Sequence, residues 1–303
     1  MLQQEPIVKA KDSMFIFNRI RDFGLLMKPN LSTMVVFSSV VGYLLAPGVQ
    51  FVWREVILLF LGGMLVTGGA NTINQILEKD SDKYMRRTMR RPLPDGRMDT
   101  KEAWIFAILT GMAGVFLLGY FFNVTTGVLS FVSMLLYAFA YTPMKKISPI
   151  AVFVGAIPGA FPPLIGWVAA TNSLSFDNAG GWVLFFIQFF WQFPHFWAIA
   201  WVGFEDYSKA GIYLLPSREG KTKFTGLQCM LYCIPLIPLA ILANEIKMSG
   251  YIGMAMAIAC GIAYFIAAVL FFKHNDHKSA KRLMFTSFIY LPVVLLALLI
   301  DKI

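Results

Sequence analysis

The sequence predicts an all-α membrane protein with nine transmembrane helices around a central cavity. Two observations carry this prediction: the overall composition and the length of the apolar windows. Of the 303 residues, 57% are hydrophobic and 14% are charged, whereas soluble domains carry about a quarter charged residues. A helix needs about 20 mostly apolar residues to cross a bilayer core of about 30 Å, and backbone amides in hydrocarbon must bond within their own segment.

Nine windows of suitable length occur along the chain. They lie near residues 29–48, 55–77, 103–122, 124–141, 149–170, 181–204, 226–244, 250–272 and 283–300. The boundary between the third and fourth windows depends on Asn123 and the small polar run that follows it. We expect a single membrane-embedded domain over residues 1–303, in which residues 1–28 form a cytoplasmic amino-terminal segment.

Lysine and arginine are distributed unevenly between alternate connecting segments. If the amino terminus is cytoplasmic, 23 of the 26 lie inside and only Arg54, Lys247 and Lys302 lie outside, as the positive-inside rule requires. The net charge of +9 then lies on the cytoplasmic face, where it would attract anionic lipids of the bilayer. No nucleic-acid binding is expected, because the basic segments are short connectors between membrane spans. The carboxyl terminus is expected outside.

A polar stripe runs along the second window. At about 100° per residue, Asn71, Asn74, Glu78 and Asp82 share one face of a helix that is otherwise apolar. Polar residues in a membrane span usually face the bundle interior or a wet cavity. Oxygen ligands of this kind bind Mg²⁺, which completes its coordination with water and substrate phosphates. The stripe is followed by basic residues suited to phosphate oxygens, namely Lys83, Arg86, Arg87, Arg90 and Arg91.

The sixth window carries a second polar set. Gln192 and His195 lie near its middle, and Glu205 and Asp206 lie at its cytoplasmic end. His195 and Asp206 are eleven residues apart, so we expect them on one helical face. Pro194 is expected to loosen or kink the helix. The two acidic helix ends suggest two halves, about 29–145 and 146–303, that close around one cavity.

Four blocks of the chain carry a family resemblance. Asn74-x₃-Glu78-x₃-Asp82 resembles the NxxxDxxxD motif of the UbiA superfamily of intramembrane prenyltransferases. The four blocks are "NQILEKDSDKYMRRTMRRPLP" from Asn74, "YTPMKK" from Tyr141, "GAIPGAFPPLIGW" from Gly155 and "PHFWAIAWVGFEDYSKAGIYLLP" from Pro194. In order and spacing they are similar to those of one family in it, the protohaem IX farnesyltransferases or haem O synthases. The motifs cover about residues 70–216, and the nine helices cover the whole chain.

The resemblance implies a UbiA-like bundle in the bacterial inner membrane and a defined reaction. The farnesyl group of farnesyl diphosphate would pass to the 2-vinyl group of haem B with addition of water, giving haem O and diphosphate. Mg²⁺ would be the cofactor, and a downstream haem A synthase would be a partner. Two departures affect the motif: Glu78 stands where Asp is usual, and the second acidic region has no DxxxD.

Roles can be assigned to individual residues on this basis. The metal ligands are expected among Asn74, Glu78, Asp82, Glu205 and Asp206, and the choice between the last two stays open. Fixed guanidinium and ammonium groups would stabilise the leaving diphosphate. The substrate-binding residues are expected to be Arg87, Arg91, Lys145, Tyr141, Gln192 and Lys209.

The remaining candidate is His195, which we expect to act as a haem ligand, as a base that orients water, or as a polar contact between helices. Electron-rich rings would line a cavity for an allylic cation, with candidates at Phe190, Trp191, Phe193, Phe196 and Trp197. The proline-rich fifth window is expected to form a close helix contact or an unwound wall. The three cysteines suggest no disulfide framework.

Two alternatives to haem farnesylation remain at this point. The first is prenylation of a quinone precursor, which would use the same acids and bases. The second is transport, since polar stripes and broken helices also serve ion pathways. Against transport, the acids cluster with arginines at the cytoplasmic mouth, and the outer halves of the second and sixth windows are almost uncharged.

Overall fold

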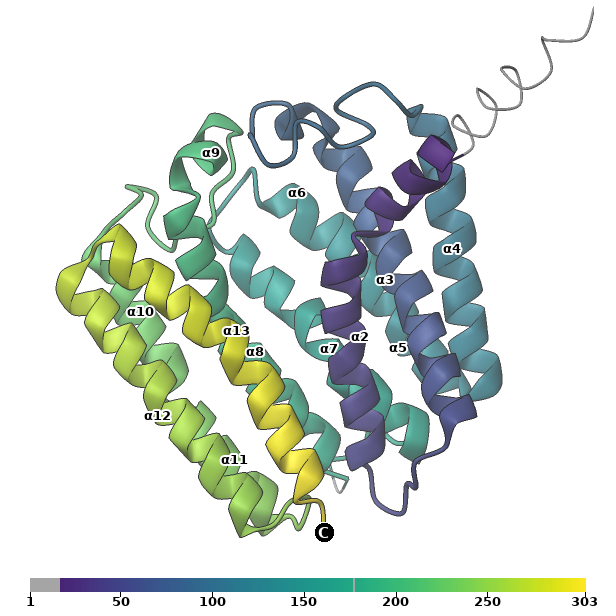
Figure 1. Cartoon of the computed structure of the whole chain (residues 1–303), viewed down its shortest axis with the longest axis vertical. Helices are drawn as coiled ribbons and strands as arrows, with labels where there is room; N and C mark the ends of the chain where they lie inside the picture. Colours follow the sequence, from purple (N-terminus) through teal and green to yellow (C-terminus); the bar gives the residue numbers. More distant parts are fainter. Residues whose placement is uncertain (1–16, 177) are drawn as a thin grey trace, which may run out of the picture.

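Long helices run alongside one another for most of the chain (Figure 1). The computed structural model describes residues 17–176 and 178–303. After an amino-terminal helix, Phe17–Met27, the elements are α2 (Pro29–Leu45), α3 (Trp53–Asp82), α4 (Thr100–Phe121), α5 (Val124–Leu135), the π-helical turn η1 (Leu136–Tyr141), α6 (Thr142–Met144), α7 (Ala151–Thr171), α8 (Gly180–Val202), α9 (Phe204–Lys209), α10 (Lys223–Cys233), α11 (Leu236–Glu245), α12 (Tyr251–His274) and α13 (His277–Ile300).

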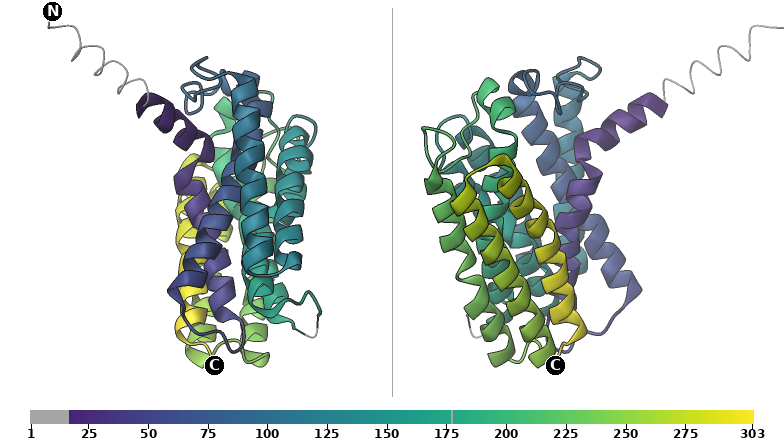
Figure 2. Two further views of the ribbon diagram at one scale, coloured as in Figure 1. Left: turned by 90° about the vertical axis from the view of Figure 1, so that its right-hand side faces the viewer. Right: turned by 60° about the vertical axis from the view of Figure 1, so that its left-hand side comes forward.

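Eight helical runs in the described residues are long and apolar enough to cross a membrane, and a bent pair raises the number to nine. The bent pair joins the amino-terminal helix to α2 at an angle of 47°, so the first helix leans away from the bundle axis (Figure 2). Lys28 forms the bend, with a left-handed φ of 48°. All nine predicted windows coincide with these runs, and the prediction of an all-helical membrane bundle is confirmed.

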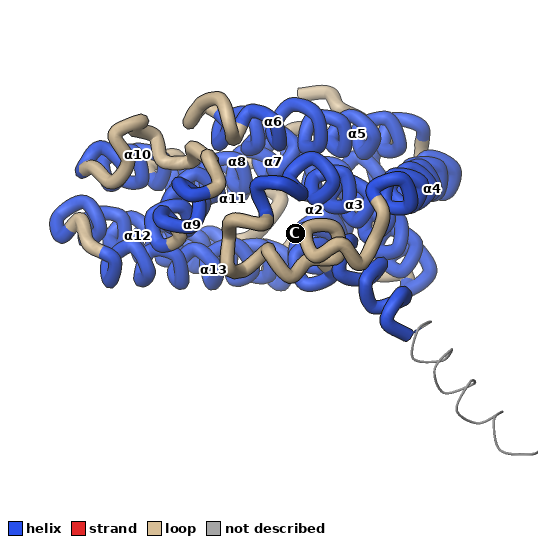
Figure 3. Tube along the Cα trace, turned by 90° about the horizontal axis from the view of Figure 1, so that it is seen from above, coloured by secondary structure: helices blue, strands red, loops and turns tan. Residues whose placement is uncertain are grey.

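The helices close into a ring. Helices that are adjacent in sequence pack against each other from α2 to α5, from α7 to α9 and from α10 to α13, and α13 returns to contact α2 and α8. Large apolar side chains cover the outside, as expected for a surface in lipid, and examples are Ile108, Phe116, Ile262 and Ile266. Seen from above, the loop of residues 83–99 runs across one end of the ring, between α3 and α4 (Figure 3).

The proline-rich segment predicted as a close contact or an unwound wall is the continuous helix α7. A Cβ atom at Gly166 would overlap the backbone of Ser39 on α2, so the close approach is the alternative that the structure shows. Pro163 lacks an amide proton, which leaves the Gly159 carbonyl without its helical donor. The Gln188 amide donates to this oxygen at 2.7 Å, and α7 is thereby tied to α8. Helix α8 itself stays unbroken through Pro194.

The two ends of the bundle carry different segments. The amino-terminal helix, the loop of residues 83–99 and α9 lie at one end, which we call the polar end, and the carboxyl end of α13 lies at the other (Figure 1). At that other end the ammonium of Lys302 donates to the carbonyl oxygens of Leu44 and Ala46, each at 2.7 Å. Since these carbonyls lie at the end of α2, the contact joins α2 to the residues that follow α13.

Candidate active site

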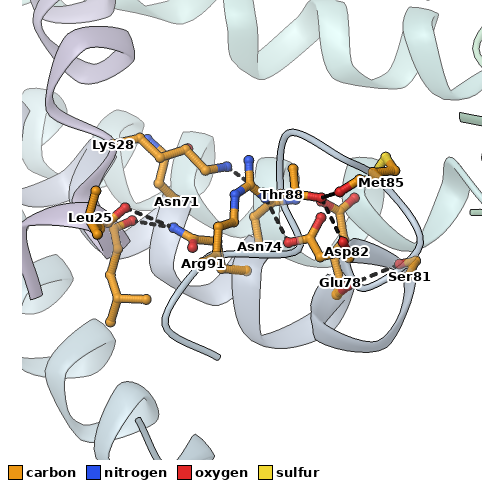
Figure 4. Close-up of polar contacts among 12 residues, drawn as sticks. Leu25, Lys28, Asn71, Asn74, Glu78, Ser81, Asp82, Met85, Thr88 and Arg91 are labelled. Atoms are coloured by element: carbon orange, nitrogen blue, oxygen red, sulfur yellow. Dashed lines mark hydrogen bonds and ion pairs between the residues drawn. The ribbon is translucent and has the colours of Figure 1, made fainter. Parts of the chain in front are cut away.

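The polar stripe on α3 faces the inside of the bundle. The side chains of Asn71, Asn74, Glu78 and Asp82 are all buried, which confirms the orientation predicted from their spacing. The Asn71 amide donates to the hydroxyl of Ser32 on α2 at 3.1 Å. The stripe therefore belongs to the packed interior, and Figure 4 shows its side chains Asn74, Glu78 and Asp82 beside Arg91.

Each of the three motif positions on α3 accepts a hydrogen bond from one cation, and each cation comes from a different segment. The three pairs are Lys28 Nζ to Asn74 Oδ1 at 2.8 Å, Lys145 Nζ to Glu78 Oε1 at 2.7 Å, and Arg91 Nη1 to Asp82 Oδ2 at 2.7 Å. Such charge-assisted bonds are stronger than neutral ones. We refer to these six residues as the acid–base cluster.

Lys28 is a member of the cluster that the sequence did not reveal. It precedes the first apolar window in a short basic segment. In the sequence, a lysine at this place is fully explained by the excess of lysine and arginine on the cytoplasmic side. The structure turns the chain at this residue, between the amino-terminal helix and α2. Its ammonium group therefore points inward to Asn74 (Figure 4). Pro29, directly after it, was the available signal, because proline favours a helix start.

Lys145 reaches the cluster because the chain is shaped by η1 and Pro143. The π-helical turn is followed directly by α6. The centre of the ring of its last residue, Tyr141, lies 4.4 Å from Nζ of Lys145. The backbone of Lys145 is also held, since its carbonyl accepts from the Tyr213 amide at 2.7 Å. Burial alone would lower the pKa of Lys145, but the nearby Glu78 carboxylate outweighs burial and raises it. The ammonium form is therefore secure.

Arg91 is returned to α3 by the loop that begins at the end of that helix. The Thr88 hydroxyl donates to the Asp82 carbonyl at 2.8 Å and curls the loop back. The Asp82 side chain is 0% exposed, and its oxygen Oδ1 is buried without a hydrogen-bond partner in the described part of the chain. A buried oxygen without a partner is costly, which makes it a free ligand for a cation.

The second acidic region differs from its prediction. Helix α8 ends at Val202, Gly203 follows, and Glu205 and Asp206 lie on the separate six-residue helix α9. The expectation that His195 and Asp206 share one helical face is therefore wrong. The physical reason is the break at Gly203, after which the count of 100° per residue starts anew.

The two acidic regions nevertheless lie at the same end of the bundle (Figure 1). The guanidinium of Arg87 covers the ring of Tyr207, next to Asp206, at 4.5 Å from the ring centre. Glu205 and Lys209 are exposed and Asp206 is partly exposed. Within residues 17–176 and 178–303, no three histidine, cysteine, aspartate or glutamate side chains come together as a metal site.

The donor set of the first region suits a hard divalent cation such as Mg²⁺. Asn74, Glu78 and Asp82 offer amide and carboxylate oxygens, which this ion prefers. Asp82 Oδ1, which has no hydrogen-bond partner within residues 17–176 and 178–303, is a buried oxygen of this kind. With so few protein ligands, water and a phosphate-bearing substrate would complete the coordination shell.

A cavity of about 510 Å³ lies in the interior between α2, α3, α5, η1, α7, α8 and α13, with one further residue, Leu118, from α4. The predicted site residues on its wall are Asn71, Tyr141, Gln192 and His195. Met34 of α2 and Phe288 of α13 also line it, yet they are 52% and 44% exposed. The cavity therefore reaches the bundle surface between α2 and α13.

The aromatic candidates divide into two groups. Trp191 and Phe196 line the cavity. Phe193 and Trp197 are instead buried in the hydrophobic core, where both rings pack on Tyr232, and Phe190 packs against the same core. Cys229, Cys233 and Cys260 are free thiols in the structure.

Comparisons with known proteins agree with this architecture. The model of the UbiA prenyltransferase family matches residues 35–290. A protein named protoheme IX farnesyltransferase from Cytophaga hutchinsonii is 47% identical over 92% of this chain and 96% of its own length. The protein of the same name from Flavobacterium psychrophilum is 40% identical over 95% of each chain.

Solved structures show the same fold. A digeranylgeranylglyceryl phosphate synthase matches 94% of this chain and 98% of its own with a TM-score of 0.77 at 20% identity. A UbiA homologue from Archaeoglobus fulgidus, bound to GPP and Mg²⁺, matches 91% and 99% with a TM-score of 0.63 at 15% identity.

Proposed function

The chain belongs to the UbiA prenyltransferase family, and on that premise we propose that it farnesylates haem. The farnesyl group of farnesyl diphosphate passes to the 2-vinyl group of haem B, water adds, and the products are haem O and diphosphate. Support comes from relatives named protoheme IX farnesyltransferase at up to 47% identity over nearly the whole chain. These relatives favour haem over a quinone precursor as the acceptor.

The acid–base cluster is the diphosphate end of the proposed site. Breaking the allylic carbon–oxygen bond places negative charge on the leaving diphosphate, and preorganised cations stabilise that charge. Lys28, Lys145 and Arg91 already converge on α3 from three segments. When the diphosphate binds, these cations exchange carboxylate and amide oxygens for phosphate oxygens.

Asn74, Glu78 and Asp82 would hold Mg²⁺ in this proposal, with Asp206 or Glu205 contributing from α9. The ion would neutralise diphosphate charge as a Lewis acid. The observation that carries the proposal is the fully buried Asp82 carboxylate. One of its oxygens accepts from Arg91, and the other has no hydrogen-bond partner among the residues that the structure describes. A homologue bound to GPP and Mg²⁺ supports the choice of ion.

The cavity would take the farnesyl chain and the porphyrin. Its walls combine apolar helices with a few polar groups, including Tyr137, Tyr141 and Gln192, so that stray water is excluded from the allylic cation. Its opening between α2 and α13 faces the lipid, which is the phase in which both substrates dissolve. The loop of residues 83–99 crosses the same end of the bundle (Figure 3), and its Arg91 contributes to the acid–base cluster.

We further propose that the chain lies in the bacterial inner membrane with its amino terminus in the cytoplasm. The basic residues of the loop of residues 83–99 lie at the end where this orientation needs them, while Arg54 and Lys302 lie at the other. A haem A synthase would then receive haem O on the membrane.

One incubation tests the reaction. Purified full-length protein is supplied with farnesyl diphosphate, Mg²⁺ and haem B, and the porphyrin is analysed by mass spectrometry. The expected result is a gain equal to one farnesyl group plus one water. A quinone precursor that gains a prenyl group while haem stays unmodified would overturn the proposal.

A further inference from the structure

His195 lies in the cavity wall and forms a single hydrogen bond within the described residues. Its Nδ1 atom lies 2.8 Å from the hydroxyl of Ser287 on α13, which is fully buried. The other ring nitrogen, Nε2, has no hydrogen bond to those residues, and the side chain borders the cavity. The role of His195 therefore depends on which nitrogen carries the proton.

Ser287 determines the answer. Its hydroxyl oxygen is 2.5 Å from the Met284 carbonyl oxygen, and since a carbonyl cannot donate, the hydroxyl proton lies between these two atoms. The Ser287 oxygen must then accept at its other contact, and His195 Nδ1 must donate. The Nε2 atom of the neutral imidazole is consequently unprotonated, and its lone pair is available to the cavity.

The ring is also fixed in orientation. Trp191 stacks on the imidazole with ring centres 4.6 Å apart, and Phe196 and Phe288 meet it edge-on at 5.2 Å each. Trp191 is itself held, because its indole N–H donates to the Ser287 carbonyl at 2.8 Å. One residue, Ser287, thus fixes both the tautomer of His195 and the ring that stacks on it.

We propose that His195 Nε2 is an axial ligand of the iron of the haem substrate, and that Ser287 is the residue that positions it. This inference rests on the proposed function. Histidines that bind metals typically donate their other ring N–H to a fixed acceptor, which sets the tautomer and raises the basicity of the ligating nitrogen. No proton is released on binding, since Nε2 is already unprotonated, and its electron pair fills an open axial position of the iron.

The arrangement also serves the reaction. An axial bond from His195 fixes the distance of the porphyrin plane from α8. The rings of Trp191, Phe196 and Phe288 limit rotation of the imidazole, and this restricts the orientation of the bound porphyrin. The vinyl group that accepts the prenyl group would then be held in one place while the cation forms. Proximity of this kind lowers the barrier without any group at the vinyl carbon itself.

The test is a titration of purified full-length protein with ferric haem B, without farnesyl diphosphate, followed by absorption and resonance Raman spectroscopy. Wild-type protein should show saturable bands of histidine-ligated haem. His195→Gly should lose these bands, and added imidazole should restore them. Ser287→Ala should keep the ligand but bind haem about tenfold or more weakly, with a shifted iron–histidine vibration, whereas Ser287→Thr should resemble wild type.

The two other histidines of the chain provide matched controls. His274→Ala and His277→Ala, at the polar end of the bundle, should leave the spectrum unchanged. Identical haem spectra for wild type and His195→Gly would overturn the inference, even if the mass assay still yields farnesylated haem. Loss of turnover with an unchanged spectrum would also overturn it and would assign His195 to water instead. A histidine-ligated spectrum without any mass gain would sustain the ligation and refute the proposed function.

Discussion

The acidic residues of α3 and those of α9 lie at the same end of the bundle, yet they differ in burial and in their ion pairs. On α3, Glu78 and Asp82 are buried in a rigid helix and each holds a cation. On α9, Glu205 and Asp206 sit on a six-residue helix, and neither side chain has an ion pair within the described residues. One acidic region is part of the folded interior, and the other is free at its surface.

This difference makes it possible to separate effects on the stability of the fold from effects on catalysis when an acidic residue is substituted. Charge removed from the α3 region disturbs packing as well as substrate binding, because a buried partner is left uncompensated. Charge removed from α9 leaves no such partner and should affect catalysis alone. The following substitutions test that separation in order of expected effect.

Asp82→Asn should have the largest effect on activity. It removes the carboxylate charge while keeping the shape of the side chain, so turnover should fall on the order of a thousandfold, the usual effect of losing a group that stabilises transition-state charge. The mass assay at saturating Mg²⁺ measures this change. Full Mg²⁺-dependent turnover in the variant would show that the α3 region is structural only.

Lys145→Met should have the largest effect on stability. It leaves the buried Glu78 carboxylate without its partner, which should lower the free energy of unfolding by about 3–5 kcal/mol. The loss should appear as a lower thermal unfolding midpoint in detergent. The double variant Glu78→Gln with Lys145→Met should recover most of the stability but not the activity. A double variant as unstable as the single one would mean that the pair itself does not stabilise the fold.

The same pair predicts a pH dependence. Because the pKa of Lys145 is raised above the ordinary 10.5, its contribution to stability is fully present below that pH and is lost only as the pH rises through the higher folded value. Unfolding midpoints should therefore show no loss from this pair between about pH 7 and pH 10. Lys145→Met should flatten any decline that wild type shows above that range.

Asp206→Asn should weaken the apparent affinity for Mg²⁺ by about tenfold to a hundredfold. Its unfolding midpoint should match wild type, because substitutions of partly exposed residues usually change stability by less than about 0.5 kcal/mol. Glu205→Gln, one position earlier, tests the other candidate ligand, and the variant that loses Mg²⁺ affinity identifies which of the two acids binds the ion. If both variants keep wild-type Mg²⁺ dependence, α9 contributes no metal ligand.

Tyr207→Leu should have the smallest effect. It removes the ring beneath Arg87, and an exposed contact of this kind corresponds to a two- to fivefold change. The expected change is in KM for farnesyl diphosphate, with kcat retained. Tyr207→Phe keeps the ring and should behave as wild type, so an equal loss in both variants would point to the hydroxyl instead.

The sequence was sufficient for the fold and for the α3 face. Membrane spans are visible because hydrocarbon tolerates few polar residues, and the stripe from Asn71 to Asp82 follows from helical geometry within one unbroken helix. The same geometry misled at His195 and Asp206, because Gly203 interrupts the helix between them. Periodicity holds only as far as the helix does.

Contacts between distant segments were outside the reach of sequence patterns. Lys28 meets Asn74 across 46 positions, and His195 meets Ser287 across 92. Pro29 marks a helix start beside Lys28 but does not show where the lysine points, and Ser287 has no distinctive local pattern; Lys28 acquires its role from a bend and Ser287 from a helix contact. The free oxygen of Asp82 is also a property of the packed structure.

The wall shared by α2 and α13 has a consequence for synthesis. At a ribosomal rate of about 5–20 residues per second, the last span emerges roughly 10–50 s after the first. During that interval α2 has no α13 beside it, and His195 has no Ser287. During this interval the nascent bundle is therefore incomplete in the bilayer. The insertion machinery or neighbouring lipid must cover its polar inner surface until α13 is synthesised and inserted.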